Sequence, residues 1–194
     1  MSARERILAA VKNSQPEHTP LPDIAFLKEP VLASKEQFAT IVQAIGATIF
    51  FVKDITEVKE ILQEKFQQLP RKITSIAALA GIADVNWIAA DPHSLENVDL
   101  AILDARLGVC ENGAVWLTEN EMVQRVTPFI ADSLAIVLTA DKLVATMHAA
   151  YEVIGDSQYG FASFIAGPSK TADIEQSLVL GAHGPRNMFI FLIH

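Results

Sequence analysis

Apolar residues recur with helical spacing in three early parts of the chain. These stripes lie within residues 7–11, 38–45 and 55–69, and each predicts an amphipathic helix. Each stripe follows a polar capping residue that has a suitable partner three positions later, and the pairs are Ser2–Glu5, Ser34–Gln37 and Asp54–Glu57. Gly46 and Pro70 end the second and third helices, because glycine closes a helix well and proline cannot continue one.

Short apolar runs separate and follow these helices and predict buried strands. The clearest runs cover residues 48–52, 72–76, 98–103, 133–138, 161–166 and 188–193. Continuous apolar strands are typical of a parallel sheet that is covered by helices on both faces. A further helix is predicted over residues 141–154, with Tyr151 on its inward face. This alternation of strands and helices predicts an α/β fold with a mainly parallel sheet.

Asn112 and Gly113 stand between apolar flanks, a pattern that favours a tight β-hairpin turn. Glu111 comes directly before this turn. A carboxylate at a strand end can act as a base or a nucleophile, as in some acyl-transfer enzymes. A solvated turn residue explains Glu111 equally well, so the local pattern leaves its role open. Cys110 is expected to be a small core residue, because nothing nearby would lower the pKa of its thiol.

The segment from residue 166 to residue 185 combines glycines, prolines, hydroxyls, a lysine and a histidine between two apolar runs. We expect a loop followed by a short helix, with Ser169 or Thr171 as the cap and Asp173 in the first turn. Such a loop lies where ligands often bind to α/β sheets. Its backbone amides, its hydroxyls and Lys170 suit a phosphate or a carboxylate, although the P-loop spacing is absent. A helix cap without a ligand is the alternative.

Three further side chains are candidates for catalysis or binding. Asp173 can orient a neighbour or act as a base, or it is an ordinary acidic residue of a first helical turn. His183 stands among glycines that allow its ring to face a cleft, as a general acid/base or a ligand contact, or it is a loop histidine bonded to the backbone. Arg125 can bind a carboxylate through its planar guanidinium, or it forms a surface ion pair.

The composition limits the class of protein. Of 194 residues, 51% are hydrophobic, and the formal net charge is −8. Such an acidic chain lacks the basic footprint of a nucleic-acid binder, and no apolar stretch approaches the roughly 20 residues that span a bilayer. A single cysteine excludes an internal disulfide and offers no Cys-x-x-Cys pair for a metal, so no metal is assigned. We expect a cytoplasmic protein whose apolar content also permits a homo-oligomer interface.

The chain divides near residue 33. Residues 1–33 hold the first helix and an extended arm that contains Pro16, Pro20, Pro22 and Pro30. Residues 34–194 are long enough for one domain with a substantial core. We therefore expect an N-terminal helix and arm joined to a single α/β domain.

Taken together, these segments resemble the LUD-domain family, and within it the lactate utilisation protein C (LutC/YkgG) group. The resemblance is strongest over residues 167–175 and 181–185, and the opening helix, the proline-rich arm and the Glu111 turn are also similar to the family. It implies a three-layer α/β sandwich of the NagB/RpiA/CoA-transferase-like type. The family turn usually reads Glu-Thr-Gly-Thr, whereas this chain has Asn112 and Ala114 and so lacks both hydroxyls.

The resemblance also implies a function. Members of this group resemble one component of a three-part system that oxidises L-lactate to pyruvate, in which partner proteins carry the iron–sulfur clusters. The chain would be a cluster-free subunit or accessory protein with a cleft for a small organic acid or a phosphorylated ligand, and no cofactor is assigned. The expected catalytic residues are Glu111, Asp173 and His183. The expected ligand-binding residues are Gly113, Arg125, Gly167, Ser169, Lys170, Thr171 and Gly184.

Two other functions fit the same residues. A stand-alone enzyme that acts on a small phosphorylated or acyl substrate is suggested by analogy with the implied fold alone. A non-catalytic binding or assembly module is suggested by the high apolar content and by the N-terminal arm.

Overall fold

The computed structural model describes residues 2–20, 22–24, 33–174 and 177–194. The chain forms two compact units, Met1–Pro30 and Val31–His194. The first unit contains helix α1 (Ala3–Asn13), which begins with the predicted capping box. The Ser2 hydroxyl accepts a hydrogen bond from the Glu5 amide (3.2 Å), and the Glu5 carboxylate accepts one from the Ser2 amide (2.6 Å). No residue of α1 is buried, and its apolar stripe of Ile7, Leu8 and Val11 is more than half exposed.

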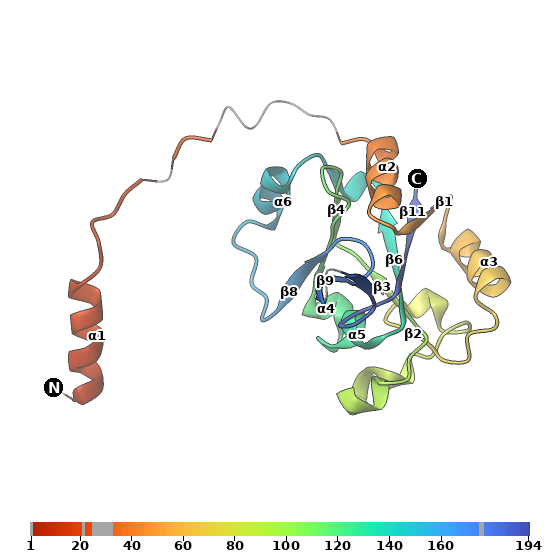
Figure 1. The fold of residues 1–194 in the computed structure, drawn as a ribbon, viewed down its shortest axis with the longest axis horizontal. Helices are drawn as coiled ribbons and strands as arrows, with labels where there is room; N and C mark the ends of the chain where they lie inside the picture. The colour runs from red at the N-terminus through yellow and green to blue at the C-terminus, as the bar shows by residue number, and fades with distance from the viewer. Residues whose placement is uncertain (1, 21, 25–32, 175–176) are drawn as a thin grey trace. The chain divides into compact units, whose positions relative to one another are not determined.

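The second unit is built on a five-stranded sheet in which every described pair of neighbouring strands is parallel (Figure 1). In spatial order its strands are β1 (Thr48–Val52), β11 (Asn187–Ile193), β6 (Ser133–Thr139), β3 (Leu100–Asp104) and β2 (Lys72–Thr74). The central strands β3 and β6 are almost completely buried, as continuous apolar runs require. The predicted α/β fold with a mainly parallel sheet is confirmed.

A second, smaller sheet packs against one face of the first. Its spatial order is β7 (Leu143–Val144), β4 (Leu107–Val109), β5 (Val115–Thr118) and β8 (Ala162–Ile165). Strands β4 and β5 are antiparallel and joined by the predicted tight turn. The Asn112 side chain accepts a hydrogen bond from the Ala114 amide (3.0 Å), and Gly113 has a φ of +71°, which favours glycine.

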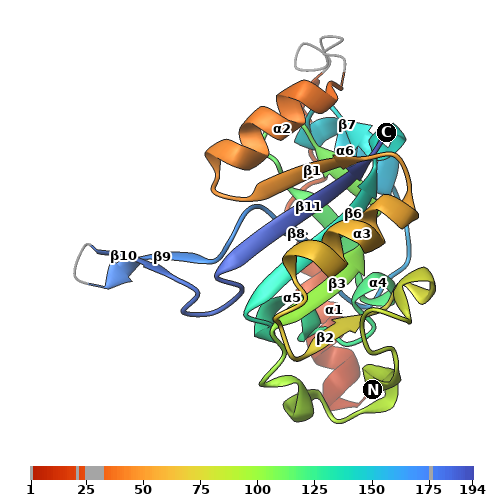
Figure 2. The ribbon, with the colours of Figure 1, turned by 90° about the vertical axis from the view of Figure 1, so that its right-hand side faces the viewer.

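The core lies in layers on the two faces of the main sheet. Helix α3 (Ile55–Lys65) covers one face (Figure 2), and its residues Val58 and Leu62 are fully buried there. Helix α2 (Lys35–Ala44) and the second sheet cover the other face. Helix α6 (Met147–Ile154) then covers the outer side of the second sheet. Among the described residues, the connections hold the one-turn helices α4 (Glu119–Met122) and α5 (Thr127–Ile130) and four 3-10 turns, Ala77–Leu79, Asn86–Ala89, Pro92–Leu95 and Ala140–Lys142.

The helix predicted after Ser169 is wrong. Strands β9 (Lys170–Ile174) and β10 (Ser177–Leu180) form an antiparallel hairpin instead, which extends away from the main sheet (Figure 2). In the sequence, Thr171 and Asp173 alternate with Ala172 and Ile174, and this period of two belongs to a strand. Neither Ser169 nor Thr171 therefore caps a helix, and Asp173 does not stand in a helical turn.

The helix predicted over residues 141–154 is too long. A 3-10 turn and strand β7 occupy its first part, and α6 begins only at Met147, where Thr146 is the N-cap. Tyr151 is 62% exposed, so it does not face inward as expected. Within the described residues, every helix is too short or too polar to cross a membrane.

Candidate functional site

The two glycine bends of the predicted site meet at the end of helix α2. A Cβ atom on Gly113 would lie 2.9 Å from Ile45 Cδ1, and one on Gly167 would lie 2.9 Å from the Ile45 carbonyl oxygen. Both glycines have positive φ, +71° and +73°, so the backbone as well as the packing requires glycine there. The structure thus brings the turn after Glu111 and the loop before Lys170 together on one residue.

Lys170 closes the C-terminus of α2. Its Nζ donates a hydrogen bond to the Ile45 carbonyl (2.6 Å), an orphan acceptor at the helix end, while the side chain stays exposed. The loop at residues 181–185 is held against Ser169, because the Ser169 amide donates a hydrogen bond to the Pro185 carbonyl (2.8 Å). The Ser169 side chain also lies close to Gly184, where an added Cβ would be 3.1 Å from Ser169 Cβ. Ser169, Lys170 and Gly184 are therefore neighbours.

Glu111 is engaged by the start of helix α6. Its carboxylate accepts a hydrogen bond from the Met147 amide (2.8 Å), one of the free amides at a helix N-terminus. Cys110 is fully buried, as predicted, and burial raises the pKa of its thiol. A buried thiol of this kind is a core residue and not a nucleophile.

Arg125 forms an ion pair. Its Nη2 lies 2.8 Å from the Glu119 carboxylate, and its guanidinium carbon lies 5.7 Å from the centre of the Phe161 ring. The Arg125 hydrogen bond, followed by one from the Gly160 amide, lowers the pKa of Glu119. The Arg125 Nε and Nη2 groups, which were expected to bind a carboxylate ligand, thus already donate to Glu119.

His183 and Gly184 line an open pocket of about 490 Å³ at the amino ends of β3, β6 and β11. The His183 side chain is exposed. Asp99 and Asp132 also line this pocket, and Arg186 Nε lies 3.1 Å from the Asp132 carboxylate. The pocket therefore carries more negative than positive charge. The side chains of Thr171 and Asp173 lie outside the part of the chain whose side chains are described.

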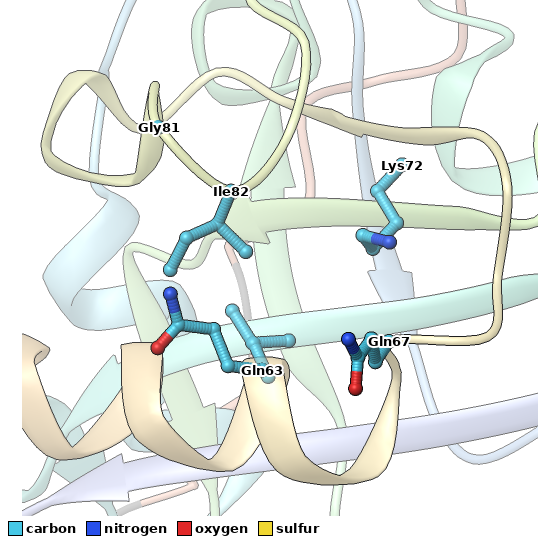
Figure 3. Close-up of a pocket in the computed structure, with 6 residues that line it drawn as sticks. Gln63, Gln67, Lys72, Gly81 and Ile82 are labelled. Carbon is cyan, nitrogen blue, oxygen red and sulfur yellow. The ribbon is translucent and has the colours of Figure 1, made fainter.

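Another pocket, of about 340 Å³, lies between α3 and the loop at residues 81–82. Figure 3 shows the Gln63 and Gln67 amides directed toward this loop and toward Lys72. The Lys72 ammonium donates a hydrogen bond to the Leu69 carbonyl (2.7 Å), which belongs to the loop that follows α3. The charged group of this pocket is thus engaged by the protein's own backbone.

Sequence reasoning missed a cluster of charges at the carboxyl edge of the main sheet. Asp104 ends β3, Arg106 follows it, and Lys142 comes shortly after β6. Loss of water around the Asp104 carboxyl raises its pKa, Lys142 opposes this effect, and Glu121 adds to it. Arg106 Nε donates to Glu121 (2.8 Å). The available signal was the position of these charges directly after buried apolar strands, where α/β proteins bind ligands.

The surroundings of Glu121 in this cluster lower its pKa. Burial alone would raise its pKa, but hydrogen bonds from the Thr118 hydroxyl and amide and from Arg106 together lower it. The Thr118 hydroxyl donates over 2.6 Å, and Glu121 in turn completes the capping box of α4. Arg106 is therefore held in place by a carboxylate that is itself fixed.

Comparison with protein-family models matches residues 91–193 to the LUD domain, which is more than half of the chain. The chain belongs to the LUD domain family. The resemblance inferred from residues 167–185 is confirmed, although the family model covers the second half of the chain and not the N-terminal helix and arm.

Each of three curated relatives matches about half of this chain. Lactate utilization protein C of Geobacillus kaustophilus is 34% identical over 101 residues, which are 49% of this chain and 41% of that protein. The protein of the same name from Oceanobacillus iheyensis is 29% identical over 104 residues, 50% of this chain and 45% of the relative. An uncharacterized protein of Neisseria meningitidis, NMB1437, is 29% identical over 100 residues, 50% of this chain and 43% of that one. The chain thus matches less than half the length of these relatives.

The fold has a solved counterpart. A DUF162 family protein from Deinococcus radiodurans superposes with a TM-score of 0.62 at 18% identity, covering 90% of this chain and 100% of that one. At this identity the likeness supports the fold and nothing finer.

Proposed function

We propose that this chain is a component of a system that oxidises L-lactate to pyruvate and that it works beside iron–sulfur subunits. The observation that carries the proposal is the LUD-domain match over residues 91–193, in a chain whose curated relatives include proteins named lactate utilization protein C. Since these relatives are about twice as long as the matched part, the role in lactate oxidation is proposed for this chain by similarity.

The division of labour with iron–sulfur partners follows from the thiol chemistry. An iron–sulfur cluster usually needs four thiolates, whereas this chain has one cysteine, Cys110, which is fully buried. Electrons taken from lactate would therefore pass to clusters in another subunit. The chain itself would contribute binding of the organic acid or assembly of the complex.

We place the organic acid at the loops that carry Ser169, Lys170, His183 and Gly184. The Lys170 ammonium has further N–H donors besides the one given to Ile45, and these suit a carboxylate. His183 is exposed and precedes Gly184, which lies against Ser169, so His183 is the candidate for moving a proton. Thr171, Asp173 and Gly167 belong to the same proposed contact region.

Glu111 and Arg125 take lesser parts in this proposal. Glu111 already accepts the Met147 amide, and Arg125 already binds Glu119. Gly113 contributes through its contact with Ile45, which holds the turn against α2. The binding of the acid is therefore assigned mainly to Lys170, and proton transfer to His183.

The test is growth of a strain that lacks this gene, with L-lactate or pyruvate as the carbon source. We expect a defect on L-lactate only, restored by the wild-type gene and not by His183→Ala. His93→Ala is the matched control, because His93 is 97% exposed and its ring contacts Asp91. Iron–sulfur proteins should co-purify with the tagged wild-type chain.

Two results would contradict the proposal. Unimpaired growth on L-lactate without the gene would remove the role in lactate oxidation. If no iron–sulfur protein co-purifies with the tagged chain, and the isolated chain turns over a sugar phosphate or an acyl-CoA, the stand-alone enzyme would be favoured.

A further inference from the structure

A pocket of about 310 Å³ opens on the outer side of the second sheet, next to the end of helix α6. Trp116 from β5, Ile154 from α6 and Tyr159 from the following loop form its apolar wall. The Trp116 and Tyr159 rings meet edge to face with their centroids 5.6 Å apart. Phe164 also packs against Trp116, with centroids 4.4 Å apart, and Trp116 is only 7% exposed, so the indole is held by its neighbours. The wall is therefore aromatic and pre-formed.

Two cations stand at the rim of this pocket. Arg106 and Lys142 both line it, and among its described lining residues there is no aspartate or glutamate. Lys142 is exposed and has Asp104 as its electrostatic neighbour. The pocket therefore offers positive charge to a ligand, in contrast to the pocket beside His183.

The Arg106 guanidinium is oriented before any ligand arrives. Its Nε donates to Glu121, whereas its two Nη groups bond to no acceptor in the described part of the chain. The Arg106 side chain is 47% exposed, and Glu121 is 15% exposed and held by the Thr118 hydroxyl. Because the arginine is fixed on one edge, its other edge keeps a planar pair of donors, which is the geometry that binds carboxylates and phosphates.

We propose that this pocket binds a small organic anion that bears an aromatic ring. The ring lies against Trp116 and Tyr159, and the anionic group lies between Arg106 and Lys142. Aromatic walls with a few placed polar groups are typical of small-molecule sites, and about 300 Å³ is at the small end of their range. Both an aromatic carboxylate and a nucleoside monophosphate have this chemistry. Lactate has no ring, so this site is separate from the one proposed above.

The experiment is a titration of the full-length chain followed by tryptophan fluorescence and calorimetry. Phenylacetate and AMP are the ring-bearing anions, acetate and inorganic phosphate carry the anion alone, and benzyl alcohol and adenosine carry the ring alone. The chain has two tryptophans. Trp116 is 7% exposed and lines this pocket, whereas Trp87 is 2% exposed and packs in the core of the main sheet, so saturable quenching reports on Trp116. We expect saturation by at least one ring-bearing anion and much weaker binding of its two partial analogues.

Lys142→Gln is the decisive variant, because Lys142 is exposed and its loss removes one of the two cations at the rim of the pocket. We expect binding to weaken about five- to tenfold, since a contact charge at a binding site typically contributes about this much. Lys65→Gln is the matched control, because Lys65 is an exposed residue at the end of α3, which covers the opposite face of the main sheet. Binding to this variant should be unchanged.

Three outcomes would overturn the proposal: no saturable binding of either ring-bearing anion, equal weakening by Lys142→Gln and Lys65→Gln, or binding of acetate or phosphate as tight as that of the ring-bearing anions. Unchanged melting temperature and circular dichroism of Lys142→Gln would show that the variant is folded. Because this titration uses no lactate and no partner protein, its failure leaves the growth experiment untouched.

Discussion

Replacing Gly113 by alanine tests whether the turn between β4 and β5 is pressed against helix α2. The added Cβ would lie 2.9 Å from Ile45 Cδ1 and 3.3 Å from Ile41 Cγ2 and Val42 Cγ2. The φ of +71° at Gly113 is also unfavourable for a residue with a side chain. Two separate physical effects therefore act against this substitution.

The magnitude follows from these two effects. A left-handed alanine costs roughly 1 kcal/mol, and forcing a methyl group into a packed region costs about 1–3 kcal/mol. The smaller conformational freedom of alanine in the unfolded chain returns about 0.5 kcal/mol. We expect Gly113→Ala to lower the free energy of unfolding by about 1.5–3.5 kcal/mol, which corresponds to a fall in melting temperature of roughly 3–14 °C for a domain of this size.

Urea unfolding followed by circular dichroism measures this loss, and two further variants assign its cause. Gly81→Ala is the control, because a Cβ at Gly81 meets nothing within 4 Å, and its stability should change little. Ile45→Val removes the Cδ1 atom that the new methyl would meet. In that background Gly113→Ala should cost about 1 kcal/mol less, a non-additivity that double-variant cycles resolve.

The reasoning is refuted if Gly113→Ala is as mild as Gly81→Ala. The predicted contact with Ile45 is refuted if the changes in the free energy of unfolding caused by Gly113→Ala and Ile45→Val are additive in the double variant. In that case backbone strain alone would explain the loss, and the turn would not press against α2.

Three other variants test single contacts. The pKa of Asp104 is raised in the folded protein, so the free energy of unfolding should fall as the pH rises from about 3.9, the pKa of an unfolded aspartate, through the folded pKa. Asp104→Asn should flatten this part of a plot of urea midpoint against pH. An unchanged slope would contradict the assignment. Lys170→Met removes the donor to the Ile45 carbonyl and should lower the free energy of unfolding by about 0.5–1 kcal/mol in the same assay; no loss would mean that the contact is not stabilising. Arg125→Gln removes the largest cause of the low pKa of Glu119, so an NMR titration should show that pKa rise.

Local signals in the sequence predicted much of the fold. The capping pairs Ser2–Glu5 and Asp54–Glu57 mark the observed starts of α1 and α3. The Asn112–Gly113 turn joins β4 and β5, and the apolar run from Ser133 became the central strand β6. These features depend on residues a few positions apart, so the chain specifies them without help from distant segments.

The segment after Ser169 shows where local signals become ambiguous. Hydroxyls followed by acidic residues suit a helix start, but the same residues alternate with apolar ones as in a strand. The hairpin of β9 and β10 resolves this ambiguity through hydrogen bonds between two strands, which no short window of sequence contains. The short strand β7 likewise exists because it pairs with β4, and so α6 starts later than its apolar spacing predicted.

By itself the sequence determined the family, the α/β class and the residue types available for chemistry. Only the tertiary structure decided which of those residues meet. Asp104 pairs with Val137 in the register of β3 and β6, and so Arg106 and Lys142 leave the sheet at one edge and share a pocket. The same packing gives Glu111, Arg125 and Lys170 separate partners, because a side chain's neighbours are set by strand register and helix docking, and not by its distance along the chain.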